Sequence, residues 1–315
     1  MKNFISLADL PDFEETLALA KSLKKDPFAF EQHAKRKTLG LLFFNPSLRT
    51  RLSTQKAAQN LGFNTMIMNF SNEAWALEFE DGTEMRGIRS EHVREAAAVV
   101  SQYCDMVAIR AFASLTDKEQ DEAEIVLNSF AQYASIPVIN MESATGHPLQ
   151  ALADAVTLSE HPTTHKPKVV LTWAPHPKAL PHAVGNSFAQ MMQAQDADFV
   201  ITNPEGYDLD PRITKNIPVV HNQEEALKNA DFVYAKNWCS YENYGSIVRT
   251  DNAWMLTTEK MELTNNAKFM HCLPVRRNIV VADGVLDHPN SLVIEQANNR
   301  TFAAQAVLKT LLDHV

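Results

Sequence analysis

The sequence is poor in several features that mark common protein classes. It has only nine glycines among its 315 residues, and it contains neither the G-x-G-x-x-G of dinucleotide-binding proteins nor the G-x-x-x-x-G-K-[ST] of P-loop proteins. Its three cysteines, Cys104, Cys239 and Cys272, are too few and too far apart for a disulfide framework or for a zinc site with paired ligands. Dinucleotide-dependent redox chemistry, P-loop hydrolysis and a disulfide-stapled secreted fold therefore all lack support in the sequence.

Positive charge and long apolar runs are scarce as well. The chain has 38 acidic and 29 basic residues, and the resulting net charge of −9 argues against nucleic-acid binding. The longest apolar stretches, such as residues 39–44, are far shorter than the ~20 residues that a membrane span requires. Residues 1–4 do not open the apolar run of a signal peptide, so we expect a cytoplasmic protein.

Short apolar runs alternate with segments of helical period along most of the chain. A helical segment is indicated, for example, by Val93, Ala96, Ala97 and Val100, whose spacing places them on one helix face. Such alternation predicts βαβ units and parallel sheets, that is, an α/β fold. The expected strands lie near residues 38–44, 64–69, 106–110, 137–141, 168–173, 198–202, 231–235 and 267–271.

The chain is long enough for two domains, each a doubly wound parallel sheet. The Pro-rich stretch 161–167 separates an expected helix from a new strand, which favours a boundary near 145–165. We therefore expect one domain over residues 1–145 and a second over 146–295. Residues 296–315 contain an expected C-terminal helix that closes the first domain.

A candidate anion site follows the first expected strand. Residues 47–51 read Ser-Leu-Arg-Thr-Arg and open a helix directly after that strand. Backbone N–H groups and the positive end of the helix dipole point out of such a turn, and the hydroxyl and guanidinium groups add donors for an oxyanion. The turn predicts a phosphate site built without glycine. The alternative is that Asn45 or Ser47 only caps the helix and that the arginines only face solvent.

Two further clusters follow later strands. Residues 147–150 read His-Pro-Leu-Gln, and a His and a Gln at a sheet edge can polarise a carbonyl group. His147 can equally well begin a helix without a further role. Residues 271–277 read His-Cys-Leu-Pro-Val-Arg-Arg, for which the alternative is a buried Cys and Leu that close a core strand before surface arginines.

The positions of these residues along the chain favour the functional interpretation. The ends of parallel strands at which open α/β sheets bind ligands are their carboxyl ends. The following residues lie at or just beyond such an end of an expected strand: Ser47, Arg110, His147, His176, Lys236 and His271. Histidines scattered through a core are not expected to sort in this way.

Segment 71–92 lacks both periodicities. It is polar and predicts a long loop, which in a compact domain is more often functional than idle. It carries an isolated Trp75, for which the simplest alternative is that the indole only covers core.

Over essentially its whole length the sequence resembles the aspartate/ornithine carbamoyltransferase family. The family's S-x-R-T-R, H-P-x-Q and H-C-L-P motifs match residues 47–51, 147–150 and 271–274, in the family's order and spacing. Asn299-Arg300 before the terminal helix matches as well, as does Arg110 after the third strand. The resemblance implies two α/β domains, the first binding carbamoyl phosphate and the second binding the acceptor.

Within that family the chain is most similar to the N-acylornithine enzymes. Segments 173–177 and 234–238 carry this similarity, together with the absence of the Ser-Met-Gly loop of ornithine carbamoyltransferases. Ser90 stands where the succinyl-using type has Pro and the acetyl-using type has Glu. Residues 278–281 lack the modified Lys of the acetyl-using type, which favours N-succinyl-L-ornithine as the acceptor in arginine biosynthesis.

The resemblance implies two sets of contact residues. Carbamoyl phosphate would contact Ser47, Leu48, Arg49, Thr50, Trp75, Arg110, His147, Gln150, Cys272, Leu273 and Arg300. The N-acylornithine would contact Ser90, Glu142, His176, Lys236 and Arg276. Catalytic roles would fall to Thr50, Arg110, His147 and Cys272. The departing phosphate can accept the amine proton, so neither a metal nor an organic cofactor is required.

The resemblance also implies an assembly. In the acylornithine branch a Trp of the neighbouring subunit reaches carbamoyl phosphate, which implies a homotrimer with shared sites and assigns this role to Trp75. Several alternatives stay open at this point. The acceptor can be N-acetylornithine, plain ornithine, putrescine or aspartate, and a protein of another class, a catalytically silent α/β sensor of phosphorylated metabolites, would keep only the Ser47 site.

Overall fold

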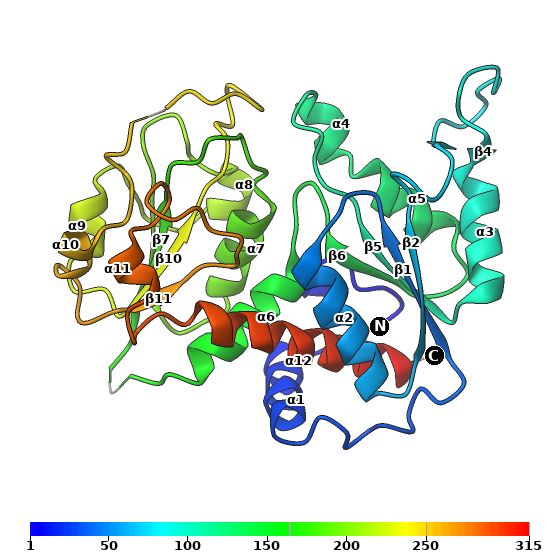
Figure 1. Cartoon of the computed structure of the whole chain (residues 1–315), viewed down its shortest axis with the longest axis horizontal. Helices are drawn as coiled ribbons and strands as arrows, with labels where there is room; N and C mark the ends of the chain where they lie inside the picture. Colours follow the sequence, from blue (N-terminus) through cyan, green and yellow to red (C-terminus); the bar gives the residue numbers. More distant parts are fainter. Residues whose placement is uncertain (164, 250, 315) are drawn as a thin grey trace. The chain divides into compact units, whose positions relative to one another are not determined.

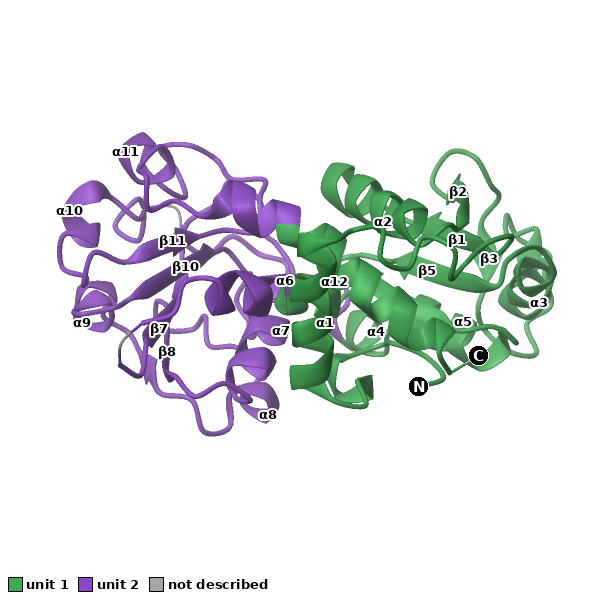
Figure 2. Ribbon diagram, turned by 90° about the horizontal axis from the view of Figure 1, so that it is seen from below, with its two compact units in different colours: residues 1–114, 119–152, 299–315 green, residues 115–118, 153–298 purple. Residues whose placement is uncertain are grey.

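The computed structural model describes residues 1–163, 165–249 and 251–314, and the chain divides into two compact units (Figures 1 and 2). Thr164, within the Pro-rich stretch, lies outside the described residues. Unit 1 comprises Met1–Ser114, Glu119–Leu152 and Asn299–Val315. Unit 2 comprises Leu115–Lys118 and Ala153–Asn298.

Unit 1 contains a four-stranded parallel sheet in the order β2-β1-β5-β6. After β1 the chain adds β2 on one side and later β5 on the other, so the topological switch point lies between β1 and β5. The elements up to the end of this sheet and the helix that follows it are η1 (Leu7–Asp9), α1 (Phe13–Lys25), β1 (Thr38–Phe43), α2 (Leu48–Asn60), β2 (Asn64–Asn69), β3 (Leu77–Glu78), β4 (Glu91–His92), α3 (Val93–Tyr103), β5 (Met106–Arg110), α4 (Lys118–Glu122), α5 (Ile125–Tyr133), β6 (Val138–Glu142) and α6 (Pro148–Ser159).

Helices cover both faces of this sheet, which explains why its central strands are apolar throughout. Leu42 of β1 packs in a cluster with residues of α3 and α5, among them Ala97 and Phe130. Because side chains alternate along a strand, Leu41 and Phe43 face the opposite side. Figure 2 shows α2 and α5 on opposite sides of β1 and β5.

Unit 2 contains a five-stranded parallel sheet in the order β11-β10-β7-β8-β9. Its switch point lies between β7 and β10, because the chain adds β8 and β9 on one side of β7 before it adds β10 on the other. The remaining elements are β7 (Lys168–Trp173), α7 (Ala183–Met192), β8 (Asp198–Thr202), α8 (Pro211–Thr214), β9 (Val219–Val220), α9 (Gln223–Leu227), β10 (Phe232–Lys236), α10 (Thr258–Met261), β11 (Lys268–Met270), α11 (Asp283–Leu286) and α12 (Val293–Leu312).

The two faces of this second sheet are also covered. On one face Val233 and Phe269 pack with Leu227 of α9 and Val285 of α11. On the other face Tyr234 of β10 meets Phe188 of α7 edge-on, with ring centroids 4.6 Å apart. The last helix, α12, begins in unit 2, and from Asn299 onward it belongs to unit 1.

The predicted α/β class with parallel sheets is confirmed, and all eight expected strands are present with ends that shift by one residue at most. Three strands were not predicted: β3, β4 and β9, each of only two residues. Among the described residues, no helix combines the length and the apolar character that a bilayer span needs.

Candidate functional site

The turn after β1 forms one wall of the predicted phosphate site. Ser47 is the N-cap of α2, and its hydroxyl oxygen accepts a hydrogen bond from the Thr50 N–H at 3.3 Å. Leu48 is largely exposed, Arg49 is half-buried and Thr50 is buried. Ser47 thus has the capping role of the simpler alternative. That role does not exclude anion binding, because the cap holds the first helical turn at the switch point of the sheet.

A buried guanidinium joins this turn to α6. Arg300 of α12 donates through Nη1 to Gln150 Oε1 at 2.6 Å and through Nη2 to Thr50 Oγ1 at 2.7 Å. All three side chains are buried, and they come from chain positions up to 250 residues apart. Three residues that the sequence resemblance assigned to one ligand therefore contact one another in the structure.

A second buried cluster lies at the carboxyl ends of β5 and β6. Arg110 forms an ion pair with Glu142, with Nε and Nη2 at 3.0 and 2.9 Å from Oε2. His147 Nε2 lies 3.7 Å from the same carboxylate oxygen. Each of the three side chains is less than a tenth exposed, so the pair is screened little by solvent. Glu142, predicted as an acceptor ligand, thus orients Arg110 in the structure.

Arg110 is further fixed by the backbone of the turn that follows β1. Its Nη1 donates to the carbonyl oxygens of Asn45 and Pro46, both at 3.1 Å. The Asn45 side chain in turn accepts a hydrogen bond from the Phe112 N–H at 2.6 Å. The sequence left open that Asn45 caps the following helix, but Ser47 is the N-cap of α2, and the Asn45 side chain instead fixes the turn.

Trp75 and Ser90 lie in segment 71–92, which is irregular apart from the short pair β3–β4. Trp75 is 57% exposed, and its indole N–H donates to Glu91 Oε2 at 2.8 Å. This exposure is incompatible with the alternative that Trp75 only covers core. Ser90 is exposed, and its N–H donates to the Ala76 carbonyl at 3.2 Å.

Glu78 cross-links the two arms of the segment. Its carboxylate accepts from the N–H groups of Phe79 and Glu80 and from Arg89 Nη1. The hydrogen bond from the Glu80 N–H is the main reason that the pKa of Glu78 lies below its ordinary value, so this carboxylate is ionised at neutral pH.

In unit 2, cations gather at the switch point between β7 and β10. His176 follows β7, and Lys236 is the last residue of β10, paired in register with Trp173. Burial lowers the pKa of His176, and the positive charges of Lys236, Arg276 and Lys178 lower it further. His176 is therefore neutral at pH 7, beside cations that can hold carboxylates.

The His-Cys-Leu-Pro turn is fixed by a chain of buried hydrogen bonds. The His271 N–H donates to Gln296 Oε1 at 2.9 Å, and Gln296 Nε2 donates to Asp154 Oδ1 at 2.7 Å. Leu273, whose φ is +55°, donates its N–H to His271 Nδ1 at 2.8 Å. The motif reveals the turn, but the sequence does not reveal Asp154 and Gln296 as its supports.

Cys272 is buried next to a phenol. Burial first, and then the neighbouring Asp154 and Cys272, raise the pKa of Tyr234 well above its ordinary value. Tyr234 therefore stays neutral at physiological pH, and the Cys272 thiol has a polar but uncharged neighbour.

The predicted site residues divide between the two units. Unit 1 holds Ser47, Leu48, Arg49, Thr50, Trp75, Ser90, Arg110, Glu142, His147, Gln150 and Arg300. Unit 2 holds His176, Lys236, Cys272, Leu273 and Arg276. Within unit 1 the structure brings together the Thr50–Gln150–Arg300 and Arg110–Glu142–His147 groups, whereas Trp75 and Ser90 stand on the exposed segment.

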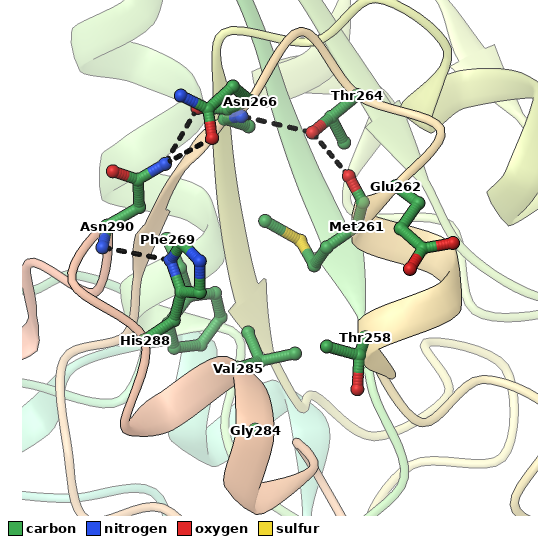
Figure 3. A pocket seen from close by; sticks show the side chains of 11 residues that line it. Thr258, Met261, Glu262, Thr264, Asn266, Phe269, Gly284, Val285, His288 and Asn290 are labelled. Carbon is green, nitrogen blue, oxygen red and sulfur yellow. Dashed lines mark hydrogen bonds between the residues drawn. The ribbon is translucent and has the colours of Figure 1, made fainter.

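Unit 2 also has a cavity of about 440 Å³ that none of these residues lines (Figure 3). Its walls combine apolar side chains such as Phe269 and Val285 with a polar rim that includes Glu262 and His288. The cavity lies at α10, α11 and the start of β11, away from the carboxyl ends of the unit 2 strands where His176 and Lys236 lie. It is thus not part of the predicted site.

Comparison with protein families matches both parts of the chain. Residues 2–160 match the carbamoyl-phosphate-binding domain of aspartate/ornithine carbamoyltransferases, and residues 182–311 match the aspartate/ornithine-binding domain. The chain belongs to the aspartate/ornithine carbamoyltransferase family. The family predicted from the three motifs is confirmed, and with it the carbamoyltransferase class of enzyme.

Relatives within this carbamoyltransferase family match over their full lengths. The N-succinylornithine carbamoyltransferase of Bacteroides fragilis is 49% identical over 317 residues, with 100% of each chain covered. The N-acetylornithine carbamoyltransferase of Xanthomonas campestris is 36% identical, with 99% of this chain and 98% of the relative covered. A crystal structure of an N-acetyl-L-ornithine transcarbamylase mutant, complexed with carbamyl phosphate and N-succinyl-L-norvaline, is 36% identical with a TM-score of 0.93 and covers 99% of this chain and 100% of its own.

Proposed function

We propose that this carbamoyltransferase moves the carbamoyl group of carbamoyl phosphate to the δ-amine of N-succinyl-L-ornithine, as a step of arginine biosynthesis. The observation that carries the proposal is the full-length identity of 49% to an N-succinylornithine enzyme, against 36% to an N-acetylornithine enzyme. No disulfide joins Cys104, Cys239 and Cys272 to one another, which is typical of a reducing compartment and supports a cytoplasmic location.

The phosphate group would bind at the turn after β1. The N-terminus of α2 offers backbone N–H groups and a positive dipole end, and Arg49 and Arg110 offer charge-assisted donors. Because Arg110 is already fixed by Glu142 and by two carbonyls, its guanidinium loses little freedom when the phosphate binds. This supports a phosphate site that is largely formed in advance.

The carbamoyl carbonyl would face Thr50, Arg110 and His147, with Gln150 and Arg300 behind it. As the amine nitrogen attacks the carbonyl carbon, negative charge grows on the carbonyl oxygen, and donors in fixed positions stabilise it. One such donor is typically worth about 3–4 kcal/mol. The Arg300 bonds to Gln150 and Thr50 support this role, since they hold both side chains in place.

The amine must attack in its neutral form, whereas a free amine has a pKa of about 10. We assign its orientation to the Cys272 thiol and the Leu273 carbonyl, because the turn that carries them is fixed by Gln296 and His271. The carbon–nitrogen bond forms, the bond from the carbonyl carbon to the phosphate oxygen breaks, and the phosphate leaves with the amine proton. The products are N-succinyl-L-citrulline and hydrogen phosphate.

The succinyl and α-carboxylates of the acceptor would meet Lys236 and Arg276. The electrostatics of His176 support this assignment: its pKa is lowered mainly by burial, and Lys236 and Arg276 are close enough for their positive charges to lower it further. Ser90 is small, neutral and exposed, which leaves room for the longer succinyl chain where a Glu would repel its carboxylate. Glu142 would complete the acceptor side from unit 1.

We further propose that the active enzyme is a homotrimer in which Trp75 of one subunit serves the site of the next. An exposed aromatic side chain on a segment whose two arms are cross-linked by Glu78 is suited to reach outside its own chain. Unit 1 also exposes Leu48 and Leu52 on one face of α2 and Met66 on the adjoining strand β2, apolar surface that supports an interface there.

The test is turnover with three acceptors offered side by side. Carbamoyl phosphate is supplied with N-succinyl-L-ornithine, N-acetyl-L-ornithine or L-ornithine, and both the phosphate and the ureido product are measured. We expect kcat/KM for the succinyl acceptor to exceed the others about 10- to 100-fold, the worth of one added charge-assisted pair. A preference for acetylornithine or ornithine would contradict the acceptor assignment, and carbamoyl-phosphate binding without turnover would indicate a sensor.

A further inference from the structure

The turn that leads from β6 to His147 is held by a side chain from another part of unit 1. This turn, Ser143–Gly146, is closed by the Ser143 N–H, which donates to the Gly146 carbonyl at 2.8 Å. Directly after it come His147 and α6 with Gln150, so its conformation sets where these two side chains lie. Ser143 and His147 are each only 2% exposed.

The carboxylate of Glu124 binds this turn through four hydrogen bonds. Its Oε1 accepts from the Ser143 hydroxyl at 2.7 Å, from the Thr145 N–H at 2.7 Å and from the Thr145 hydroxyl at 2.5 Å. Its Oε2 accepts from the Ala144 N–H at 3.3 Å. Bonds to an ionised acceptor are about twice as strong as neutral ones, and here they immobilise three consecutive residues.

Glu124 itself has an unfavourable backbone conformation. Its φ of +51° and ψ of +40° lie in the left-handed region, which non-glycine residues rarely adopt. It occupies the N-cap position of α5, yet its side chain makes no capping bond to that helix. A helix cap alone therefore does not explain the residue. A strained residue that directs its charge away from its own helix and onto the turn before His147 fits a role at the site.

We propose that Glu124 is a positioning residue for the carbamoyl end of the site. By fixing Ser143–Gly146, it fixes the origin of α6 and hence the places of His147 and Gln150. The latter is bonded in turn to Arg300. This inference rests on the proposed function, because it assigns Glu124 an effect on the carbamoyl-transfer step. A displacement of about 1 Å at such donors lowers a rate about 100-fold.

Two substitutions separate this role from a structural one. Glu124→Gln keeps the size and the backbone strain but removes the charge and one acceptor oxygen. Glu124→Gly removes the whole carboxylate while it relieves the strain, since glycine adopts a positive φ freely. Asn229→Gly is the matched control, because Asn229 has a φ of +58° in unit 2 and belongs to neither predicted residue set.

The variants are compared with the wild type in carbamoyl transfer, inorganic phosphate binding by calorimetry, hydrogen exchange and thermal unfolding. We expect kcat to fall about 10- to 100-fold in both Glu124 variants. We expect the dissociation constant for phosphate, which depends on the turn after β1, to change less than about threefold. Exchange at the Ala144 and Thr145 amides should accelerate. Glu124→Gly should melt no lower than Glu124→Gln, and Asn229→Gly should keep the wild-type kcat.

Three other results would overturn the inference. An unchanged kcat in Glu124→Gly, with the wild type active, would show that the carboxylate has no positioning role. A fall in kcat that is matched by an equal loss of phosphate binding and by a lower melting temperature would show a general structural role instead. If the wild type itself turns over none of the three acceptors, the proposed function fails, and this inference falls with it. If Glu124→Gln does not fold, Glu124→Gly alone decides.

Discussion

Units 1 and 2 both contain a parallel sheet, yet their predicted ligand residues differ in burial and in the number of protein groups that bind them. In unit 1, Arg110, Gln150 and Arg300 are all less than a tenth exposed, and each is bound by other protein groups. In unit 2, His176 is half-buried and Arg276 is exposed. Arg110, Gln150 and Arg300, assigned to carbamoyl phosphate, are therefore held by other protein groups, whereas His176 and Arg276, assigned to the acceptor, are more exposed.

This difference matches what each side would have to do. Donors that stabilise a developing charge act best when they need no rearrangement, which favours the buried, cross-linked groups of unit 1. Exposed cations on long side chains can meet carboxylates at several distances. Such a division lets acceptor preference change through a few side chains while the carbamoyl-phosphate residues stay the same.

The largest effect should come from the fixed side. In Arg49→Ala we expect kcat/KM to fall about 1000-fold, because a charge-assisted phosphate ligand is lost. The melting temperature should stay within about 2 °C of the wild type, since a half-buried ligand residue contributes little to folding. Lys56→Ala on the same helix controls for the loss of a cation. A lower melting temperature together with full specific activity of the folded protein would contradict the assignment.

A matched pair of Arg→Lys substitutions tests the comparison directly. In Arg300→Lys the ammonium cannot hold Gln150 and Thr50 together as the guanidinium fork does, so we expect a loss of about 2 kcal/mol in unfolding free energy and about 100-fold in kcat/KM. In Arg276→Lys, on an exposed residue, both quantities should change little, with kcat/KM within about threefold. Chemical denaturation and steady-state kinetics check both variants, and equal effects would erase the distinction between the units.

The proposed role of Trp75 extends the comparison to the proposed trimer. We expect Trp75→Ala to raise the KM for carbamoyl phosphate about 5- to 30-fold without unfolding, because packing and N–H donor contacts of an indole are worth about 1–2 kcal/mol. Tyr103→Ala, which removes another exposed aromatic side chain, is the control. If sites are shared, mixed trimers of Trp75→Ala and Arg49→Ala should recover part of the wild-type activity. An unchanged KM for carbamoyl phosphate would contradict the role of Trp75.

The adaptable side should respond more selectively. In Arg276→Gln we expect the KM for N-succinyl-L-ornithine to rise about 10-fold, with kcat nearly unchanged, because one carboxylate partner is lost from binding. The KM for N-acetyl-L-ornithine should change less than about threefold if Arg276 meets the succinyl carboxylate. Equal changes in KM for both acceptors would indicate that Arg276 instead binds the α-carboxylate, which both acceptors have.

The smallest expected effect is the uptake of protons when the acceptor binds. Burial and the cations Lys236, Arg276 and Lys178 hold the pKa of His176 below its ordinary value, and a dianionic ligand that offsets those charges should raise it. N-succinyl-L-norvaline should then bind with uptake of a fraction of a proton near pH 6, measured by calorimetry in two buffers. His176→Gln should abolish this uptake, and release of protons in the wild type would contradict the assignment.

The same pKa has a consequence for stability. Because the folded protein binds the His176 proton less readily than the unfolded chain does, the unfolding free energy should decline as the pH falls below about 6.5, the ordinary His value. It should stop declining once the pH has passed the lower pKa of the folded state. Thermal unfolding of wild type and His176→Gln over this range measures the contribution.

Much of this arrangement follows from local sequence. The central strands are continuous apolar runs of the kind that a parallel sheet covered on both faces requires, and for that reason they were predictable. The edge strand β2 has no buried residue and was predictable only from its short apolar run, residues 66–68. The motif residues were predictable because chemistry-bearing side chains follow those runs directly. Strands β3, β4 and β9 were not, because two residues carry no periodic signal.

The contacts that support the site could not be predicted from the sequence, although the resemblance did predict Arg300 as a carbamoyl-phosphate residue. Arg300 reaches Thr50 across 250 residues, and Glu124 reaches its turn across about 20, so no local pattern links them. The order of the strands, which creates the two switch points, is likewise a property of the whole chain. Residues that bind a ligand thus leave a local signature, whereas those that hold them in place depend on tertiary packing.

The return of α12 to unit 1 has a consequence for biosynthesis. Arg300, which locks Thr50 to Gln150, is made after all of unit 2. During translation the residues of the first sheet emerge early. Thr50 and Gln150 can form their hydrogen bonds to Arg300 only after the last part of the chain has been synthesised. A nascent chain halted between the two family domains would therefore contain every strand of the first sheet but lack Arg300. The site can be completed only when synthesis of the chain is nearly finished.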